Sequence, residues 1–487
     1  MAAIYELAEA VRQGLRSVPE DGVRPVLQSL FGERFQKRHF EASVIRDAYA
    51  LASGDDKDGV PFAGLIHPDN PPSGPYGGTS LVWFPTAEHG SLISFVVGTR
   101  GLSPDEGILT KPGHRRRLVA LRRYLRDLGV DTWTKGDPSA LNQAVPKVAR
   151  EMFPGFERVF QRYGSEVYCL AKVPDDSEGA RKVVQAFLDL YAHERGWQVL
   201  QAYKEESEAL LGAIWERTFE AVDAARVNAL LQERRFVILQ GPPGTGKTRL
   251  AEEVRRDHFG GQGITVQFHP AVTYEDFVVG LSPDAQAGSL RFGVRPGWLI
   301  EAARLAKDEP ALLVLDEINR ADLAKVLGEA VFLFEPSEVG GASARTVRLA
   351  HALDGDFEFR LPEGLYVLGT MNTADRSIAP VDIAIRRRFA FVTLLPQRAV
   401  VAAQNLPLAV KVFDDLAGVF VEHVPEDGLD LLPGHAYFLA PNEAALRRRF
   451  HYELVPLLDE YLRQGLVGPA ASELQAVRDT ISDLASA

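Results

Sequence analysis

The sequence has a single cysteine, Cys169, in 487 residues. It therefore cannot form an intrachain disulfide or a metal site built from several thiolates, and this composition suits a reducing cytoplasm. No stretch approaches the roughly 18 uninterrupted apolar residues that a membrane-spanning helix requires. The first residues lack the basic and apolar regions of a secretory signal. We expect a cytoplasmic protein that does not enter a membrane.

The chain also lacks an excess of positive charge. Lys and Arg number 54 against 66 Asp and Glu, which gives a net charge of −12 and a pI near 5.5. This balance argues against a surface that binds nucleic acid everywhere, so any such binding has to come from a local basic patch. Apolar residues make up 46% of the chain, which is ordinary for a globular protein. The length suits two or three domains.

Regions of the chain differ in their pattern. Residues 1–200 mix helical stretches with two β-rich runs between 77 and 99, and they predict an α+β N-terminal domain. Residues 201–233 predict a helical connector. From 234 to 396, short apolar strands alternate with helical segments, which indicates an α/β fold with a parallel sheet and helices on both faces. Residues 397–487 predict helices.

A phosphate-binding loop follows the predicted strand RFVILQ. The loop GPPGTGKT leads into the helical segment RLAEEVRRD, which is the strand–loop–helix setting that the G-x-x-x-x-G-K-[ST] pattern requires. Its backbone N–H groups can cradle phosphate oxygens at a helix N-terminus. Lys247 supplies charge for the β- and γ-phosphates, and Thr248 supplies a hydroxyl for Mg²⁺. The predicted nucleotide-binding residues are Gly241, Pro242, Pro243, Gly244, Thr245, Gly246, Lys247, Thr248 and Asp316.

A second element, ALLVLDEINRAD, ends an apolar run in Asp316 and Glu317. In an open α/β sheet this strand end lies beside the phosphate loop. We predict that Asp316, with Thr248, holds Mg²⁺ and that Glu317 polarises the attacking water, because phosphoryl transfer depends mainly on positioning and charge. The alternative is an acidic strand end that caps the next helix.

The stretch GLYVLGTMNTADRS predicts a further strand that ends at Asn372. We expect this strand to lie between the two already named, so that Asn372 reaches the γ-phosphate or the attacking water. The spacing of Asn372 and Asp375 also matches the element with which small GTPases read guanine. That interpretation requires the loop to reach the base on the far side of the nucleotide, so it is weak evidence for GTP.

Arg386, Arg387 and Arg388 end a predicted helix just before an edge strand. In a ring assembly such cations can face the nucleotide of the neighbouring subunit and stabilise transition-state charge. We predict this role for Arg386 and Arg387. The alternative is that the arginines complement the C-terminal end of the helix, which accounts for one or two of the three.

These motifs, with VQFHPAVTYEDFVVGL and LPGHAYFLA, resemble the McrB family, the AAA+ motor subunits of modification-dependent restriction systems. The resemblance covers about residues 234–462. The strings FHPAVTYEDF, DEINRAD and MNTADRS are specific to this branch, whereas the phosphate loop is shared by AAA+ proteins in general. More distantly, the chain is similar to MoxR-type chaperone ATPases.

The resemblance implies an AAA+ domain with a helical lid at 397–487, assembled as a hexameric ring with nucleotide at the subunit interfaces. It implies Mg²⁺-dependent hydrolysis of GTP or ATP, stimulated by a separate McrC-like nuclease subunit. Asp375 and Arg376 would lie near the interface, and the lid candidates for a sensor are His435 and Arg447. The catalytic residues that it assigns are Glu317, Asn372, Arg386 and Arg387.

The N-terminal region has no motif of a named DNA-reading domain. Its segment HRRRLVALRRYLRD concentrates arginines in one predicted helix, and such density can bind phosphates. Nearby Tyr76, Trp83 and Phe84 can stack on a flipped base. The alternative, slightly favoured for the aromatics, is a solvated helix face packed on a hairpin whose rings form a core. The predicted DNA contacts are Arg115, Arg116, Arg122 and Arg123.

Two functions compete. The first is the motor NTPase of a restriction complex that binds DNA, including modified DNA, while a partner cleaves, since no nuclease motif is visible in the chain. The second is a MoxR-like remodelling ATPase that acts on protein clients. A neighbouring nuclease gene and stimulation by DNA favour the first, and stimulation by a client favours the second. A nucleotide-gated module without turnover is disfavoured by Glu317 and the arginines.

Overall fold

The computed structural model describes residues 2–18, 21–49, 59–71, 73–284, 291–341, 344–374 and 382–486. The chain divides into two compact units, which are Met1–Thr218 with Val421–His423 and Phe219–Phe420 with Val424–Ala487. Each unit has hydrophobic cores of its own. None of the helices in the described residues has the length and apolar character needed to cross a membrane.

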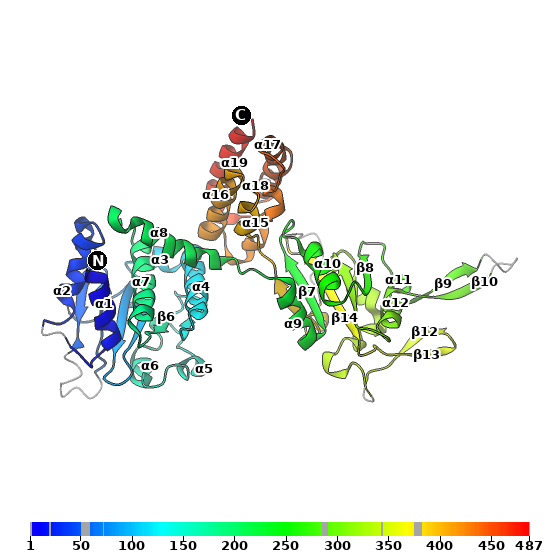
Figure 1. The fold of residues 1–487 in the computed structure, drawn as a ribbon, viewed down its shortest axis with the longest axis horizontal. Helices are drawn as coiled ribbons and strands as arrows, with labels where there is room; N and C mark the ends of the chain where they lie inside the picture. The colour runs from blue at the N-terminus through cyan, green and yellow to red at the C-terminus, as the bar shows by residue number, and fades with distance from the viewer. Residues whose placement is uncertain are drawn as a thin grey trace. The chain divides into compact units, whose positions relative to one another are not determined.

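In the described residues, the first unit contains a six-stranded antiparallel sheet in the order β1-β2-β3-β4-β6-β5. Figure 1 shows this sheet, with β6 labelled, among the helices of the unit. Its strands are β1 (Val44–Asp47), β2 (Ala63–Ile66), β3 (Thr79–Pro85), β4 (Ser91–Val97), β5 (Thr132–Thr134) and β6 (Val167–Lys172). Side chains alternate between the faces, so Trp83 and Ile93 enter one core while Phe84 and Leu92 enter another. The β-rich runs between 77 and 99 therefore form a central hairpin that is buried on both sides.

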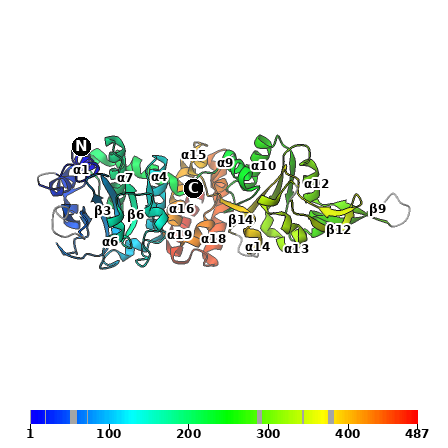
Figure 2. The same ribbon diagram turned by 90° about the horizontal axis from the view of Figure 1, so that it is seen from below.

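Helices cover both faces of this sheet. They are α1 (Ala2–Gln13), α2 (Arg24–Glu33), α3 (Glu106–Leu109), α4 (Pro112–Asp127), α5 (Lys147–Arg150), α6 (Glu157–Tyr163), α7 (Ser177–Glu194) and α8 (Gln201–Trp215), with the 3-10 segments η1 (Lys37–Ala42) and η3 (Glu216–Thr218). Helices α1, α2, α4 and α7 pack on the Trp83 face, and α5 and α6 pack on the Phe84 face. Helix α7 begins at Asp176, whose side chain accepts from the N–H of Gly179, and lies beside α1 (Figure 2).

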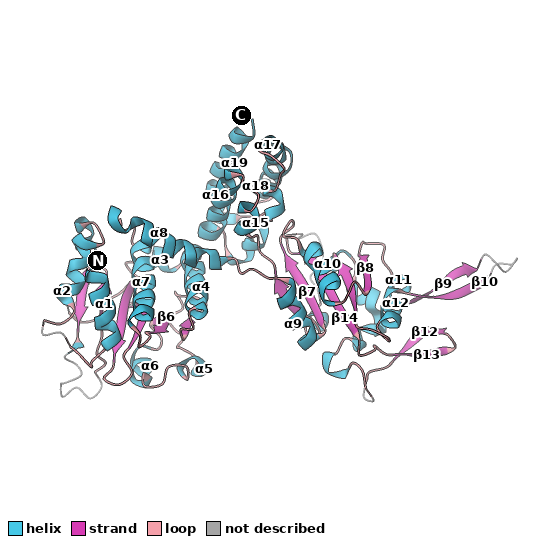
Figure 3. Ribbon diagram, viewed as in Figure 1, coloured by secondary structure: helices cyan, strands magenta, loops and turns pink. Residues whose placement is uncertain are grey.

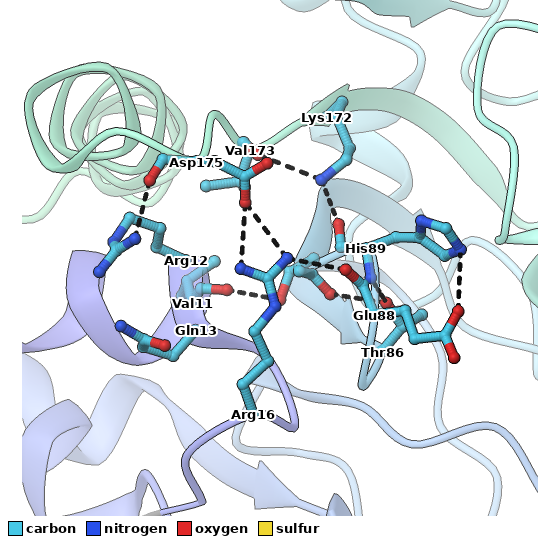
Figure 4. A network of polar contacts seen from close by, with 12 residues as sticks. Val11, Arg12, Gln13, Arg16, Thr86, Glu88, His89, Lys172, Val173 and Asp175 are labelled. Atoms are coloured by element: carbon cyan, nitrogen blue, oxygen red, sulfur yellow. Dashed lines mark hydrogen bonds and ion pairs between the residues drawn. The ribbon is translucent and has the colours of Figure 1, made fainter.

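Charged side chains fasten the turn of the β3–β4 hairpin (Figure 4). Arg16 donates from Nη2 to the carbonyl of Glu88 at 2.8 Å, and its guanidinium lies 3.2 Å from the carboxylate of Asp175. The ammonium of Lys172 donates to the carbonyl of His89. Segments far apart in the sequence thus meet at this end of the sheet, where the charges serve the fold.

The described part of the second unit contains a five-stranded parallel sheet in the order β15-β7-β14-β11-β8. Figure 3 labels its strands β7, β14 and β8. The strands are β7 (Phe236–Gly241), β8 (Gly263–Gln267), β11 (Ala311–Asp316), β14 (Leu365–Asn372) and β15 (Ala390–Thr393). Strand β11 is buried along its whole length, because helices cover both faces of a parallel sheet. This confirms the predicted AAA+ α/β fold, and β14 lies between β7 and β11 as expected.

Helices and two hairpins complete the α/β part. The helices are α9 (Ala224–Arg234), α10 (Lys247–His258), α11 (Tyr274–Phe277), α12 (Trp298–Leu305), α13 (Leu323–Leu327) and α14 (Ile383–Arg386), with 3-10 segments η4 (Ile318–Arg320), η5 (Gly328–Leu333) and η6 (Pro336–Glu338). One antiparallel hairpin pairs β9 (Val279–Asp284) with β10 (Arg291–Pro296), and the other pairs β12 (Val347–Leu353) with β13 (Asp356–Phe359). The main sheet and the segments that leave its strand ends build most of the site described below.

The C-terminal part is helical, as its sequence indicates. It contains α15 (Arg398–Ala402), α16 (Pro407–His423), α17 (Glu443–Arg449), α18 (Val455–Arg463) and α19 (Ala471–Ser486), with the short segments η7 (Glu426–Leu431), η8 (His435–Phe438), η9 (Phe450–Leu454, a π-helix) and η10 (Gly468–Ala470). Its core contains Phe413, Leu446 and Leu458. We call this part the lid, because its segment η8 reaches the phosphate loop.

Candidate nucleotide-hydrolysis site

The phosphate loop leaves β7 at Gly241 and ends at Gly246, the residue before α10. Gly241, Gly244 and Gly246 have φ angles of 149°, 79° and 78°, which glycine adopts without strain. A Cβ on Gly241 would lie 2.1 Å from the carbonyl oxygen of Leu394. The backbone conformation and the lack of space therefore both require glycine at position 241. Helix α10 begins directly after the loop, so the N–H groups of its first turn face the loop.

Lys247 is 7% exposed and turns into the loop. Its Nζ donates to the carbonyl oxygens of Gly241 at 3.0 Å and Pro242 at 2.8 Å. Burial lowers the pKa of Lys247 to about 8, against the opposing effect of Glu317 and Asp316. Neutral carbonyls are weaker partners for an ammonium group than anionic oxygens. The lysine is therefore positioned to exchange them for phosphate.

Hydroxyl groups join the two acidic residues into one network. Asp316 accepts at Oδ1 from Thr248 Oγ1 at 2.7 Å and from Thr370 Oγ1 at 2.6 Å. Thr370 Oγ1 in turn accepts from the backbone N–H of Glu317 at 3.1 Å. Sequence reasoning missed Thr370, because threonine in an apolar strand is ordinary. Its position two residues before Asn372, on the same face of β14, is the signal that could have found it.

The backbone of Glu317 lies in the left-handed region, with φ of 55° and ψ of 45°, which is uncommon outside glycine and often marks functional sites. Asn372 Nδ2 donates to Glu317 Oε1 at 2.5 Å. Glu317 Oε2 is buried without a hydrogen-bond partner among the described residues, although Arg320 Nε lies 3.5 Å away. The structure thus brings Glu317 and Asn372 together and leaves one carboxylate oxygen able to accept a hydrogen bond.

Asn319 is a second residue that sequence reasoning missed. It is 6% exposed, and its Nδ2 donates to the backbone carbonyl of Asn372 at 3.1 Å. Its Oδ1 is buried and has no hydrogen-bond partner within the described parts of the chain. Buried acceptors without donors are costly and rare. Asn319 and Glu317 therefore each keep one buried oxygen atom that can still accept a hydrogen bond.

The oxygen atoms next to the loop fit Mg²⁺. The hydroxyl of Thr248 and the carboxylate of Asp316 meet at 2.7 Å, and both are hard oxygen donors. Mg²⁺ is usually held by one or two protein groups together with nucleotide phosphates and water. Across the described residues, no group of three or more His, Cys, Asp or Glu side chains could hold a metal alone. The Thr248 hydroxyl and the Asp316 carboxylate suit a metal that also binds phosphate oxygens and water.

The three arginines at the end of α14 differ in exposure. Arg386 and Arg387 are exposed, whereas Arg388 is 4% exposed. Arg388 donates from Nη1 to a carbonyl of its own helix at 2.5 Å, so it closes the helix end. The exposed pair remains available for the predicted finger role. Asp375 and Arg376 lie outside the described residues.

The lid contacts the phosphate loop through backbone atoms. The N–H of Gly434 donates to the carbonyl of Pro243, and the N–H of Ala436 donates to the carbonyl of Gly244, both at 3.0 Å. A Cβ on Gly434 would lie 2.1 Å from the carbonyl carbon of Gly244. The approach therefore requires glycine at position 434 of the lid.

His435 lies in the same segment. Its Nδ1 accepts from the N–H of Gln397 at 3.3 Å, so the neutral ring carries its proton on Nε2. Burial, and then Arg249, lowers the pKa of His435, which favours this neutral form. Arg447, the other predicted candidate, is bound to Glu443 and to α19. Arg449 instead donates to the carbonyl of Ala436 at 3.1 Å and supports the lid segment.

The arginine-dense helix of the first unit is α4. Arg116 is 4% exposed, and Arg122 is half-buried. Arg115 Nη2 lies 3.2 Å from the carboxylate of Asp137. Arg123 donates to the backbone carbonyls of Arg217 and Thr218 at 2.8 Å and 3.0 Å. Their contact with DNA stays a prediction, with least geometric support for the buried Arg116.

The aromatic residues near this helix have different surroundings. Trp83 and Phe84 are 1% and 2% exposed and belong to the cores on either face of the sheet. Neither ring has a free face for stacking, so the prediction that they hold a flipped base has no support. Tyr76 lies apart from them in the lining of a cavity.

One protein-family model and two known proteins resemble this chain. A family model described as an AAA domain of the dynein-related subfamily matches residues 236–389. The chain is 29% identical over 349 residues to the Type IV methyl-directed restriction enzyme EcoKMcrB subunit of Escherichia coli K12, across 65% of this chain and 75% of that protein. It is 26% identical over 189 residues to the Type II restriction enzyme BsuMI component YdiS of Bacillus subtilis 168, across 32% of this chain and 55% of that protein.

A solved structure from Cytophaga hutchinsonii is 18% identical, covers 54% of this chain and 79% of its own, and has a TM-score of 0.25, too low to support an inference. The residues matched by the family model hold the phosphate loop and the network around Thr370. The two relatives confirm the resemblance found in the motifs. Over its nucleotide-binding part, the chain therefore resembles the McrB-like AAA+ subunits of restriction systems.

Proposed function

We propose that this chain is the nucleotide-hydrolysing motor subunit of an McrBC-like DNA restriction complex and that its substrate is GTP or ATP. The observation that supports this best is the network of Thr370, Asp316, Glu317 and Asn372 at the strand ends beside the phosphate loop. A site of this kind binds and positions phosphates and water, which is most of what phosphoryl transfer requires.

In this proposal the loop amides and Lys247 bind the β- and γ-phosphates. Thr248 and Asp316 hold Mg²⁺, which when bound neutralises charge on the phosphate oxygens. Glu317 accepts a hydrogen bond from the attacking water at Oε2, while Asn372 fixes its other oxygen. Such general-base help typically contributes about 10²- to 10⁴-fold in rate.

The proposal includes a cytoplasmic hexameric ring in which Arg386 and Arg387 of one subunit face the nucleotide of the next. An arginine supplied across an interface can stabilise the charge of the transition state. A separate McrC-like nuclease cleaves DNA, and the first unit recognises DNA, including modified DNA. The relation to the EcoKMcrB subunit supports this arrangement.

Phosphate release tests the proposal. The full chain is supplied with GTP or ATP, alone, with duplex DNA, and with an McrC-like nuclease subunit. We expect release from one of the two nucleotides, increased by the nuclease and DNA. Glu309→Gln, which changes an exposed carboxylate outside the site, should behave as the unmodified chain. A rate of hydrolysis that does not change with DNA and nuclease but increases with an unfolded protein would contradict the proposed motor function and favour a remodelling ATPase.

A further inference from the structure

The phosphate loop has different neighbours on its two sides. In the sheet order β15-β7-β14-β11, strands β14 and β11 lie on one side of β7, and β15 lies on the other. Asn372 ends β14 and Glu317 follows β11, whereas Gln397 follows β15. In the proposed function the γ-phosphate faces Glu317 and Asn372. The α-phosphate, the ribose and the base then extend toward the β15 side, at the carboxyl ends of the strands.

His435 of the lid lies on the β15 side. Its Nδ1 accepts from the N–H of Gln397 at 3.3 Å, which orients the ring and leaves the proton on Nε2. This Nε2 lies 3.7 Å from the position that a Cβ of Gly246 would occupy. No hydrogen bond joins Nε2 to another residue that the structure describes. His435 therefore presents a free N–H donor at the edge of the phosphate loop.

Arg249 is a second donor on this side. It follows Gly246 by three positions, about one turn along α10, so both lie on the same side of the helix. Burial, and then the charge of Arg249, lowers the pKa of His435, which agrees with this placement. Arg249 is exposed and has no ion pair or hydrogen bond within the described parts of the chain. The two donors therefore lie near each other, and neither is used by the protein.

The position of Arg249 is unfavourable for a cation. The first turn of α10 has no acidic residue, and the partial positive charge of a helix N-terminus disfavours a cation there. Phosphates bind to the backbone N–H groups of such a turn. An exposed arginine side chain extends past these groups, so its guanidinium reaches the part of the nucleotide beyond the phosphates. A ligand with acceptors in that part would give this cation a partner.

We propose that Arg249 and His435 read the base of the nucleotide by donating to O6 and N7 of guanine, so that GTP is preferred over ATP. Guanine presents these two acceptors side by side, and arginine donates to both in its commonest specific contact with this base. Adenine keeps N7 but has an amino group in place of O6, which would face N–H groups that cannot accept from it. The inference rests on the proposed function, because it requires phosphates in the loop.

The test measures the binding of nucleoside diphosphates, which does not depend on hydrolysis. A fluorescent GDP labelled on the ribose is displaced from the full chain by GDP, ADP or IDP, whose base keeps O6 and N7 but lacks the 2-amino group. We expect GDP and IDP to bind at least about tenfold more tightly than ADP, the effect of one hydrogen bond to a charged group. Arg249→Met should remove most of this preference by weakening GDP and IDP, with ADP unchanged.

A second variant and a control accompany this change. His435→Asn keeps an acceptor close to the position of Nδ1 but removes the Nε2 donor, and we expect it to reduce the preference about two- to tenfold. Arg256→Met makes the same substitution as Arg249→Met in the last turn of α10, at a side chain that is 69% exposed. It should leave all three affinities unchanged. Thermal unfolding checks the fold of each variant.

A preference for GDP and IDP that both variants reduce supports the proposal. Absence of binding, equal binding of the three diphosphates, tighter binding of ADP, or a preference that the variants do not alter overturns it. An equal loss for all three in Arg249→Met also overturns it, since the arginine would then bind a phosphate or the ribose. Phosphate release with DNA and nuclease tests the motor function separately, so each proposal can fail while the other stands.

Discussion

Two carboxylates, Asp189 in the first unit and Glu317 in the second, differ in how completely their oxygen atoms are paired. In the first unit, Arg34 donates to both oxygens of Asp189 at 3.0 Å and 2.5 Å, and the two side chains are 2% and 0% exposed. In the second unit, Glu317 has one bonded oxygen and one without a hydrogen-bond donor among the described residues. A fully paired carboxylate holds a fold together, whereas a partly paired one keeps capacity for another donor. Remaining hydrogen-bond capacity is therefore a better guide to function here than burial.

The strongest test of this contrast is Glu317→Gln. We expect the variant to bind nucleotide but to lose turnover by about 10²- to 10⁴-fold, because an amide cannot take a proton from water. Single-turnover phosphate release, beside binding of a fluorescent nucleotide, separates the two effects. Hydrolysis within a few-fold of the unmodified chain would remove Glu317 from the chemistry.

The matching change in the first unit is Asp189→Ala. It leaves Arg34 buried without its main partner, which we expect to lower the free energy of unfolding by about 3 to 5 kcal/mol. Asp175→Ala is the control, since that side chain is 71% exposed in its pair with Arg16 and should cost at most about 1 kcal/mol. Urea unfolding followed by a probe in the first unit measures both. Equal losses of unfolding free energy in the two variants would show that the buried pair of Asp189 stabilises the fold no more than the exposed pair of Asp175.

A pH titration tests whether the buried Lys247 has a lowered pKa that controls nucleotide binding. Burial lowers the pKa of Lys247 to about 8, so its ammonium group is charged below this pH and loses its proton as the pH rises through it. We expect nucleotide affinity to fall about tenfold between pH 7 and pH 9, in proportion to the charged fraction. Lys247→Arg stays charged over this range and should not show the fall. If the nucleotide affinity of the unmodified chain stays constant between pH 7 and pH 9, the pKa of Lys247 is not lowered into this range.

The smallest effect concerns the arginine helix α4. Arg122→Ala and Arg123→Ala should each weaken DNA binding modestly, and each should reduce the salt dependence of the binding constant by about one unit of slope if the arginine binds one phosphate. Lys182→Ala, an exposed cation on α7, serves as the control. An unchanged salt-controlled titration would assign these arginines to packing, as their contacts in the first unit suggest for Arg123.

Much of the nucleotide site could be predicted from sequence because its requirements are local. The glycines of the loop, Lys247 and Thr248 lie within one short segment, and Asp316, Glu317 and Asn372 each end an apolar strand. Thr370 was harder to predict. Its spacing from Asn372 places it on the same face of β14, but its hydrogen bonds to Asp316 and Glu317 join neighbouring strands, and the pattern of β14 alone does not contain them.

The first unit was harder to predict because its charged residues depend on distant partners. Arg117 in α4 is 2% exposed and donates to Glu194 at the end of α7, 77 positions later in the chain. A run of arginines in a sequence does not reveal which of them will be enclosed by such contacts. The cavity beside Tyr76 has the same origin, since its lining comes from separate strands, a loop and α6.

The contact between lid and phosphate loop has an energetic consequence. Two backbone hydrogen bonds join Gly434 to Pro243 and Ala436 to Gly244, and together they contribute about 1 to 3 kcal/mol. A difference of this size corresponds to an open population between about one in six and one in a hundred and fifty, if these bonds alone decide the equilibrium. We therefore expect thermal motion to release the lid often without help from hydrolysis. Nucleotide exchange would then be limited by the ligand's own contacts and not by the lid.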